Sequence, residues 1–574
     1  MKLRTGIIAL IATLFLTTEA KSQSQTSQEY YYLLLFKDKM LNYVRLDEPE
    51  TFLSAKSLER RQKHNIAVDT FDLPVTKAYV DNVAKRDVKV MYTTKWLNGV
   101  VVSTKVPDSA RILLRSWYIK KAVYLGKSED RWFDKPSGHS EPEGPLELAD
   151  DTNDNETYGK AYDQIKMIGG LPLHQQGHRG QGISIAVFDE GFYKVDRLKV
   201  FQHLHLNQQI KGTFDIVSGD DDVYQDGDHG MKVLSCVAGS QRGKMTGTAP
   251  DADYYLFRTE DNSSEYLIEE INWIKAAEIA DSIGVDIINS SLGYTTFDDK
   301  GMNHSWADLD GKTTYITRGA NLASSRGILV VNSAGNDGNK SWKYIDPPGD
   351  SKAILTVGAI DMDGELADFS SVNYSKTGFT KPDIVAPGKR VYVANSYGSV
   401  STGNGTSYAC PITTGMCACL LQLNPTAKPL EVIRAVQKSG DRSFYPDDQY
   451  GYGVPNFNLA NTFLGGNKDF DYSKVQFVPI EERFQSNAFE VDVYNMDYEE
   501  LEFWVTVKKR FIFFTYYKKL GKSTFLTDES FTRVQAFVPQ KYLGKEIKLK
   551  AVVIGANGKK TFYSPTFIIN SNQG

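Results

Sequence analysis

Several features that would point to a class of function are scarce or absent in this sequence. Neither sign of charge is in large excess, because 66 Lys and Arg stand against 71 Asp and Glu, a formal net charge of -5. That balance gives no reason to expect nucleic acid or an anionic membrane as the main partner. Beyond the first residues no stretch is long, apolar and free of polar residues, so we expect no membrane span in the mature protein. No internal repeat of solenoid or propeller length is present.

Cysteine is also scarce, and its placement does not favour a disulfide framework. Only 4 cysteines occur; Cys410, Cys417 and Cys419 crowd one short apolar segment, and Cys236 lies in another. An exported protein could pair an even number of cysteines. Small thiols packed among Ala and Gly are more often free and buried. We therefore predict four free, buried thiols, with disulfides as the alternative.

The composition is that of a globular protein with several domains. Hydrophobic residues make up 41% and charged residues 24% of the 574 residues, a balance unlike that of disordered chains. At roughly 150 residues a domain, the length predicts three or four domains.

The first residues resemble an export signal. Lys2 and Arg4 precede an apolar stretch at 7–16, and Ala20 provides a small residue at its exit. A positive start, a short apolar centre and a small exit residue are typical of a secretory signal peptide. The apolar stretch is shorter than the roughly 20 residues that a bilayer requires, which disfavours the alternative of an uncleaved anchor. We predict a signal peptide at 1–20 and an exported protein that is extracellular, periplasmic or on the cell surface.

The next two segments differ sharply in composition. Residues 21–127 predict a small α+β unit, with strands near 30–36, 88–92 and 97–102 and a charged helix near 57–64. Residues 128–157 predict a linker, since the run SGHSEPEGPLELADDTNDNET is acidic and poor in large apolar groups. Such a stretch buries too little surface to fold and is readily cut by proteases.

Residues 158–465 alternate between short apolar runs and helical stretches. Helices are expected at 265–282 and 316–325, and strands at 183–188, 252–257, 286–289, 328–332 and 354–358. Apolar strands that alternate with helices predict an α/β fold, a buried parallel sheet with helices on both faces. Functional loops of such sheets gather at the carboxyl ends of the strands.

Residues 466–574 have a different periodicity. Phe489, Val491 and Val493 alternate with polar neighbours, as do Ile547 and Leu549. A period of two predicts half-exposed antiparallel strands, and hence a C-terminal β domain resembling a small sandwich.

Two motifs in the α/β region place an acid and an imidazole next to glycine. Asp189 stands in the run AVFDEG at 186–191, in the turn that follows a predicted strand, where most aspartates are ordinary turn residues. His229, in the run DHGMKV, is expected at the start of a helix, with Gly230 allowing a close backbone approach. Either residue alone is a weak signal of function.

A third motif, GNGTSYACP at 403–411, favours a nucleophile. Its glycines permit a sharp turn that places Ser407 at the entry to an apolar, small-residue helix. Pro411 suits the first turn of that helix, where its missing N–H is harmless. A capping loop is the alternative.

A fourth motif, VVNSAGNDG at 330–338, delivers Asn336 to a loop after a strand. The amide of Asn336 could donate to a developing oxyanion. An ordinary Asn-Asp-Gly turn explains the motif equally well, and the motif alone does not separate the two.

Together, these motifs resemble the signature blocks of subtilisin-like serine proteases, the subtilase family. The residues DEG, HGMKV, SAGNDG and GTSYACP occur in that family's order of Asp, His and Ser. The segments GTAP at 247–250, KPDIVAPG at 381–388 and YGYGVP at 450–455 are also similar, so that the resemblance spans about 158–464. Glu190 departs from the usual Thr or Ser and Tyr408 from the usual Met.

The resemblance implies a fold, an activity and roles for residues. It implies a serine endopeptidase of protein or peptide substrates, with Asp189, His229 and Ser407 as the catalytic triad and Asn336 in the oxyanion hole. Substrate backbone would pair with Ser291, Leu292 and Gly293. Residues 21–127 resemble such an enzyme's propeptide, which implies an intramolecular chaperone and transient inhibitor. We therefore expect a zymogen that cuts itself between about 127 and 158.

The resemblance implies no required cofactor, although related enzymes often bind calcium. The acidic stretch from Asp220 to Asp228 is the obvious calcium candidate, but Tyr224 falls where an EF-hand needs a ligand, which favours a solvated loop. Two rival functions were weighed. A catalytically idle binding protein would usually lack a triad residue, and an α/β-hydrolase esterase would need Gly-x-Ser-x-Gly and the order Ser, Asp, His.

Overall fold

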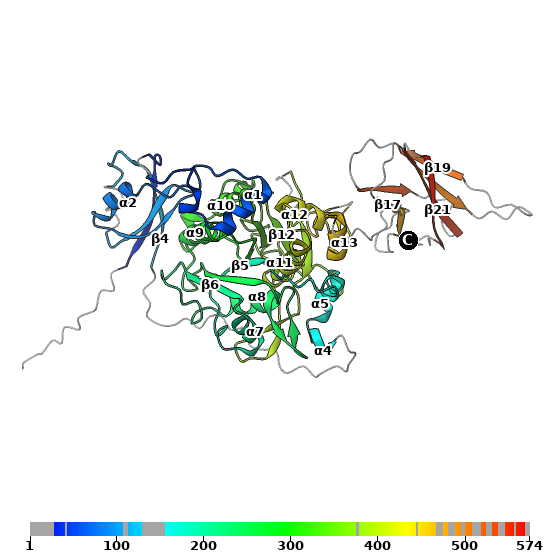
Figure 1. The fold of residues 1–574 in the computed structure, drawn as a ribbon, viewed down its shortest axis with the longest axis horizontal. Helices are drawn as coiled ribbons and strands as arrows, with labels where there is room; N and C mark the ends of the chain where they lie inside the picture. Colours follow the sequence, from blue (N-terminus) through cyan, green and yellow to red (C-terminus); the bar gives the residue numbers. More distant parts are fainter. Residues whose placement is uncertain are drawn as a thin grey trace, which may run out of the picture.

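The structure is a computed structural model that describes residues 28–40, 43–106, 113–128, 155–374, 378–443 and 446–465, together with the strands between 475 and 568. The predicted signal peptide at 1–20 and most of the predicted linker at 128–157 lie outside the described residues. An N-terminal domain, a central domain and a C-terminal pair of sheets follow one another along the chain (Figure 1).

The N-terminal domain is an antiparallel sheet with two helices, as the α+β prediction requires. Its strand order is β2-β3-β1-β4. The strands are β1 (Tyr30–Phe36), β2 (Lys89–Thr94), β3 (Gly99–Thr104) and β4 (Ile119–Lys127), and the helices are α1 (Ala55–His64) and α2 (Lys77–Ala84). A 3₁₀ turn, η1 (Pro49–Thr51), precedes α1, whose first turn is capped by the Ser54 side chain, which accepts from the Ser57 N–H at 3.1 Å.

Both faces of this sheet are covered. Because side chains alternate along a strand, Leu34 and Val100 pack with α2, whereas Leu33 and Val101 pack into the core of the central domain. The N-terminal domain is therefore packed against the central domain rather than tethered to it.

The central domain contains a seven-stranded sheet of order β13-β12-β11-β10-β5-β9-β6, in which all neighbouring strands are parallel. The strands are β5 (Ser184–Asp189), β6 (Ile210–Asp215), β9 (Asp253–Arg258), β10 (Ile287–Ser290), β11 (Leu329–Ser333), β12 (Leu355–Ile360) and β13 (Ile384–Pro387). The short pairs β7 (Ser240–Gln241) with β8 (Met245–Thr246) and β14 (Val391–Ala394) with β15 (Val400–Gly403) lie outside it. The predicted parallel sheet is confirmed.

The helices of this domain cover both faces of the sheet. Along β5, Ile185 and Val187 join the core formed with α8 and α11, whereas Ala186 and Phe188 join the core formed with α9 and α10. The helices are α4 (Asn155–Tyr158), α5 (Tyr162–Met167), α6 (Leu171–Gln175), α7 (Gln202–Leu206), α8 (His229–Ala238), α9 (Ile268–Ile283), α10 (Tyr315–Ser325), α11 (Thr406–Leu423), α12 (Pro429–Lys438) and α13 (Phe457–Phe463), with 3₁₀ turns η2 (Lys199–Phe201), η3 (Lys300–Met302) and η4 (Trp306–Asp308).

Two strands of the sheet, β6 and β13, were not predicted from the sequence. β6, with sequence IKGTFD, is a partly exposed edge strand that lacks a continuous apolar run. β13 is fully buried but has only four residues and ends in proline. Both depend on pairing with a neighbour more than on local pattern, whereas the five predicted strands were found with ends shifted by one or two residues.

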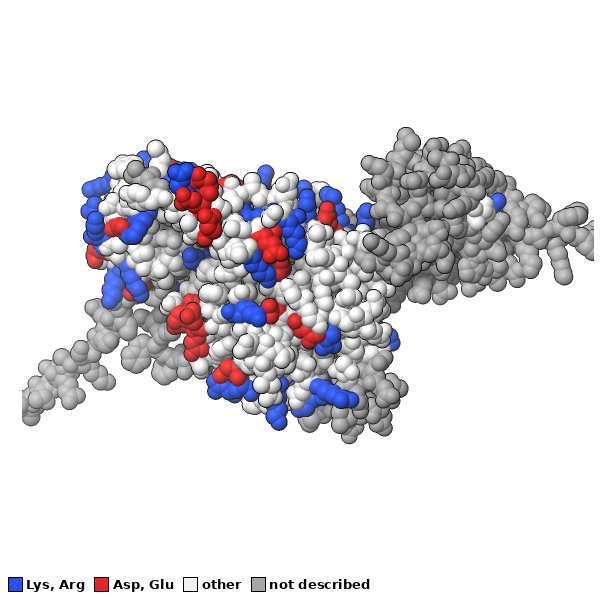
Figure 2. Space-filling view, viewed as in Figure 1, with Lys and Arg blue, Asp and Glu red and all other residues white. Residues whose placement is uncertain are grey.

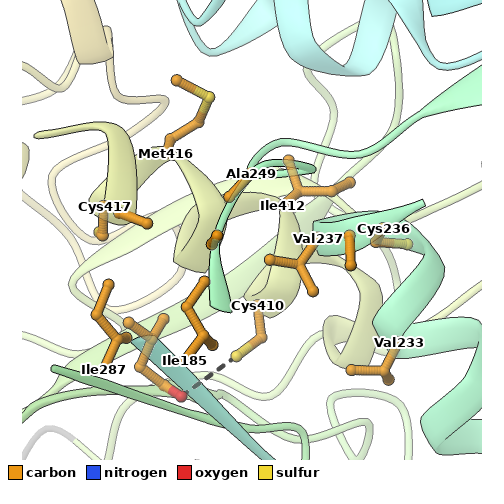
Figure 3. Close-up of a cluster of buried hydrophobic side chains, with 14 of the residues drawn as sticks. Ile185, Val233, Cys236, Val237, Ala249, Ile287, Cys410, Ile412, Met416 and Cys417 are labelled. Carbon is orange, nitrogen blue, oxygen red and sulfur yellow. Dashed lines mark hydrogen bonds between the residues drawn. The ribbon is translucent and has the colours of Figure 1, made fainter. Parts of the chain in front are cut away.

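All four cysteines are free and buried, which confirms the prediction for the thiols. Figure 3 shows Cys410 among Val237, Ile185 and Ile287, in the core beneath α11. Burial raises the pKa of the Cys236 and Cys410 thiols to about 12, so both are protonated at neutral pH.

The C-terminal region forms two antiparallel sheets, of orders β16-β17-β20 and β19-β18-β21-β22. The strands are β16 (Val475–Pro479), β17 (Ala488–Tyr494), β18 (Glu500–Val507), β19 (Lys518–Ser523), β20 (Phe531–Phe537), β21 (Glu546–Gly555) and β22 (Gly558–Ile568). Contacts between β16 and β22 join the sheets, in agreement with the predicted sandwich-like domain.

The surface agrees with the balanced charge of the sequence. Figure 2 shows acidic and basic side chains interspersed over the visible face of the described residues. Within the part of the chain that the structure describes, none of the helices has the length and apolarity needed to cross a bilayer.

Candidate active site

Asp189 is the last residue of β5, at the carboxyl edge of the sheet, where a parallel fold places its functional groups. Its side chain is fully buried. One carboxylate oxygen, Oδ1, accepts from the Glu190 N–H at 2.9 Å and from His229 Nδ1 at 2.8 Å. The other, Oδ2, is buried and has no hydrogen-bond partner among the described residues.

His229 begins α8, as its motif predicted, and its ring is 29% exposed. Gly230 is needed beside it, because a Cβ there would lie 2.3 Å from the Gly191 carbonyl oxygen. Since a carboxylate only accepts, Nδ1 carries the proton of this bond, which leaves Nε2 for other chemistry. Burial works to lower the pKa of His229, but the charge and hydrogen bond of Asp189, aided by the charge of Glu190, outweigh it and raise the pKa to about 9.

Glu190 makes hydrogen bonds to both Asp189 and His229. Its backbone N–H holds Asp189, and its Oε1 accepts from the backbone N–H of His229 at 3.2 Å. Arg258 Nε donates to the Glu190 carbonyl at 3.2 Å and fixes the turn. A carboxylate cannot donate to Asp189, which explains why Asp189 Oδ2 is left unpartnered. The sequence identified Glu190 as a departure but did not reveal this bridging position.

Ser407 lies in the first turn of α11 and is 6% exposed. The predicted position of Pro411 in that first turn is wrong. The helix begins at Thr406, so Pro411 stands in its second turn, not its first. Proline there has no N–H to give to the Ser407 carbonyl four residues earlier. The Ser291 hydroxyl replaces that donor, with Ser291 Oγ donating to Ser407 O at 2.9 Å. A contact across 116 residues thus satisfies the backbone at Ser407.

The Ser407 hydroxyl itself donates to the Ser291 carbonyl at 3.4 Å, a long bond. Among the described residues no hydrogen bond joins Ser407 to His229, although the ring of Tyr408, the next residue, lies 6.0 Å from that of His229. Catalytic hydrogen bonds are often long before substrate binds and tighten in the reacting complex.

Asn336 follows β11 and faces the start of α11. Its Oδ1 accepts from the Thr406 N–H at 2.9 Å and from Thr406 Oγ1 at 3.0 Å. Two bonds to the oxygen fix the orientation of the amide and leave its NH₂ free to donate. Thr406, which the sequence analysis did not single out, therefore aims the Asn336 donor.

Comparisons with known proteins identify the family of the chain. The family model described as "Subtilase family" matches residues 180–453, and that of the "Peptidase S8 propeptide domain, Bacteroidota" matches 31–135. Serine protease AprX of Bacillus subtilis (strain 168) is 31% identical over 315 residues, which cover 50% of this chain and 67% of that protein. The chain belongs to the subtilase family. It is a subtilisin-like serine endopeptidase with a propeptide domain.

Two further proteins are similar to part of this subtilase. Subtilisin NAT of Bacillus subtilis subsp. natto is 29% identical over 303 residues, or 52% of this chain and 70% of that protein. The solved structure of the prenylagaramide maturation protease PagA matches with 23% identity and a TM-score of 0.42, over 52% of this chain and 99% of that one.

The segment that the resemblance assigned to substrate backbone follows β10 directly. Ser291 is buried, Leu292 is half-buried, and Gly293 is exposed. The Leu292 carbonyl accepts from Asn332 Nδ2 at 3.1 Å, which holds the segment next to β11. The segment thus lies next to Ser407, which Ser291 contacts, and next to β11, the strand that leads to Asn336.

The propeptide domain of this subtilase is anchored on α9 and α10. Trp96 and Leu97 pack into the apolar core of those helices. The Glu278 carboxylate of α9 accepts from Thr94 Oγ1 at 2.6 Å and from two backbone N–H groups of the turn after β2. A second contact comes from α1, where Arg60 Nη2 lies 2.6 Å from the buried carboxylate of Asp281.

Four carboxylates of the acidic stretch from Asp220 to Asp228, the calcium candidate, contact other groups of the protein. Asp228 pairs with Lys232 at 2.9 Å, and Asp226 lies 3.5 Å from Arg258. Asp220 and Asp222 accept backbone N–H groups of their own loop at 3.0 Å. Among the described residues no group of three or more His, Cys, Asp or Glu is placed to hold a metal ion.

Proposed function

We propose that this subtilase is an exported, self-processing zymogen in which Asp189, His229 and Ser407 form the catalytic triad. The observation that carries the proposal is the 2.8 Å hydrogen bond between His229 Nδ1 and the buried Asp189 carboxylate. Once His229 loses its second proton, this bond fixes the tautomer in which Nε2 is unprotonated and can accept from a hydroxyl, which is the function of such a pair in serine proteases.

In the proposed mechanism Ser407 Oγ leaves the Ser291 carbonyl and attacks the carbonyl carbon of the scissile bond. His229 Nε2 takes the hydroxyl proton and then gives it to the leaving amine, which yields an acyl-enzyme. Water, activated by the same imidazole, hydrolyses the acyl-enzyme. Asp189 stabilises the imidazolium that forms in both halves of the reaction.

The oxyanion is proposed to accept from the Asn336 amide and the Ser407 backbone N–H. The support is the pair of bonds from Thr406 to Asn336 Oδ1, which orient the NH₂ group before substrate arrives. Such preorganised donors act most strongly on charge that develops in the transition state. Ser291, Leu292 and Gly293 are proposed to align the substrate backbone as an added strand.

The propeptide is proposed to occupy 21–127, to inhibit the enzyme until it is removed, and to be cut from the protease within 128–157. Its packing on α9 and α10 supports this role. The end of β4 also passes close to the segment before α9: a Cβ on Gly126 would lie 2.5 Å from the Tyr266 side chain. The last residues of β4 therefore lie against the protease itself.

The remaining assignments are proposals of the same kind. A signal peptide at 1–20 would direct export to an extracellular, periplasmic or surface location. The protease domain would span 158–465 and the β domain 466–574. Peptide hydrolysis by a triad requires no metal or organic cofactor.

Three variants of the full chain test the proposal: Ser407→Ala, His229→Ala and the double variant. Each should remain uncut when purified from a protease-deficient host, whereas the parent should lose residues up to the linker, as mass spectrometry of the N-terminus would reveal. Because Ser407 and His229 act as a unit, each single change should abolish nearly all turnover of peptide p-nitroanilides, and the double change should cost little more. Equal trimming of parent and Ser407→Ala would refute self-processing, and turnover by Ser407→Ala would refute the triad.

A further inference from the structure

Asp346 has a buried carboxyl group that nothing in the described part of the chain satisfies. The residue is 8% exposed, and its Oδ1 is buried without a hydrogen-bond partner. The nearby cation Lys340 is engaged elsewhere, 2.8 Å from Asp337. Buried polar groups are almost always hydrogen-bonded in folded proteins, so an unpartnered carboxyl group requires an explanation.

This carboxyl group lies between two glycines that flank the proposed substrate. A Cβ on Gly335 would lie 2.1 Å from Asp346 Oδ2, and a Cβ on Gly293 would lie 2.5 Å from Asp346 Cβ and 3.1 Å from Oδ2. Gly335 precedes Asn336, and Gly293 ends the backbone-binding segment. The carboxyl group therefore lies against the residue that precedes the proposed oxyanion donor and against the last residue of the backbone-binding segment.

The position of Asp346 bears on which substrate side chain the site accepts. If Ser407 and Asn336 hold the scissile carbonyl, the side chain of the residue that bears this carbonyl starts next to them. The two neighbouring segments present glycine, so neither contributes a side chain that would separate the substrate from Asp346. A substrate lysine has a flexible four-carbon stem before its ammonium, and arginine presents a fork of donors that matches a carboxylate.

We propose that Asp346 is a specificity-determining residue that selects Lys or Arg on the amino side of the scissile bond. The inference rests on the proposed roles of Ser407 and Asn336. A cationic side chain taken out of water needs an opposite charge with free hydrogen-bonding capacity. Asp346 offers both, as a carboxylate at the base of the primary pocket does in trypsin.

A purely structural role is the alternative, in which Asp346 is simply a neutral buried acid. Burial raises the pKa of Asp346 well above its usual value, the charge of Asp337 raises it further, and Lys340 opposes both. The group is thus protonated more readily than an ordinary aspartate until a cation reaches it. If Asp346 determines specificity, lowering the pH should raise the KM for basic substrates but not for apolar ones. A purely structural role predicts no such difference between the two kinds of substrate.

The experiment compares the parent full chain, after any processing, with Asp346→Asn and with Asp251→Asn as the matched control. Substrates are two peptide p-nitroanilides that differ only in Arg or Leu before the scissile bond, and active enzyme is counted with a fluorophosphonate label. The parent should prefer the Arg substrate, and Asp346→Asn should lower the Arg-to-Leu ratio of kcat/KM by on the order of 100-fold. Asp251 is paired with Arg179 at 2.9 Å and its charge does not act on Asp346, so Asp251→Asn should leave that ratio unchanged.

Each other outcome is decisive. A parent that prefers Leu, or an Asp346→Asn variant that loses both substrates equally, would overturn the inference. If Asp346→Asn does not fold, the parent is tested with two peptide aldehydes that end in argininal or leucinal. Tighter inhibition by argininal supports the inference, and tighter inhibition by leucinal refutes it. A parent whose turnover survives Ser407→Ala would instead refute the proposed triad, which separates the two failures.

Discussion

Asp281 lies at the end of α9. We expect its substitution to weaken the binding of the propeptide to the protease more than any other single change. Its carboxylate is 0% exposed and receives Arg60 Nη2 at 2.6 Å, Arg61 Nη2 at 2.9 Å and Lys95 Nζ at 3.3 Å. All three cations belong to the propeptide domain, so the cluster forms only while that domain is bound.

Asp281→Asn keeps the shape of the residue but removes its charge. Arg60 then retains only carbonyl partners, at Val285, Arg326 and residue 281, whereas Arg61 keeps Asp72. Breaking a buried ion pair typically costs 3–5 kcal/mol, and because the amide oxygen still accepts we expect the lower end, about 3 kcal/mol. At about 1.4 kcal/mol for each tenfold change, that free energy predicts a loss of roughly 100-fold in propeptide affinity.

The assay is inhibition of processed enzyme by separately expressed residues 21–127. The inhibition constant should rise about 100-fold for Asp281→Asn, whereas kcat/KM on a peptide substrate should not change, since without the propeptide the site faces water. Lys77→Ala in the propeptide is the control, because Lys77 is 79% exposed and its pair with Asp81 contributes little. An inhibition constant within about threefold of the parent value would refute the buried-pair reasoning.

Two further predictions concern the active site. Asn336→Ala should leave a folded enzyme whose kcat falls by about 10²–10³-fold, a scale taken from subtilisin itself, with little change in KM; an unchanged kcat in steady-state assays would make Asn336 the ordinary turn residue. Burial and the charge of Lys232 lower the pKa of His229, whereas Asp189 and the charge of Glu190 raise it. Glu190→Gln removes one of the charges that raise it, so the acid limb of kcat/KM should move to lower pH. The pH profile of the variant checks this, and a limb that stays or moves upward would contradict it.

Short segments of the sequence determined which residues could do chemistry. Asp189, His229 and Ser407 each stand within two residues of a glycine, at the end of a strand or the start of a helix, and such turns can be identified within about ten residues. The apolar runs likewise predicted the parallel sheet, because buried strands need continuous hydrophobic sequence.

Only the tertiary structure decided how these residues are supported. Ser291 satisfies the Ser407 carbonyl that Pro411 leaves open, and Arg60 reaches Asp281 across 221 residues. Asp346 lies between two glycines, Gly293 and Gly335, from the loops that follow β10 and β11. A local pattern reports the backbone preferences of neighbouring residues, but these contacts depend on which distant segments the sheet brings together, and the sequence carries no local signal for that.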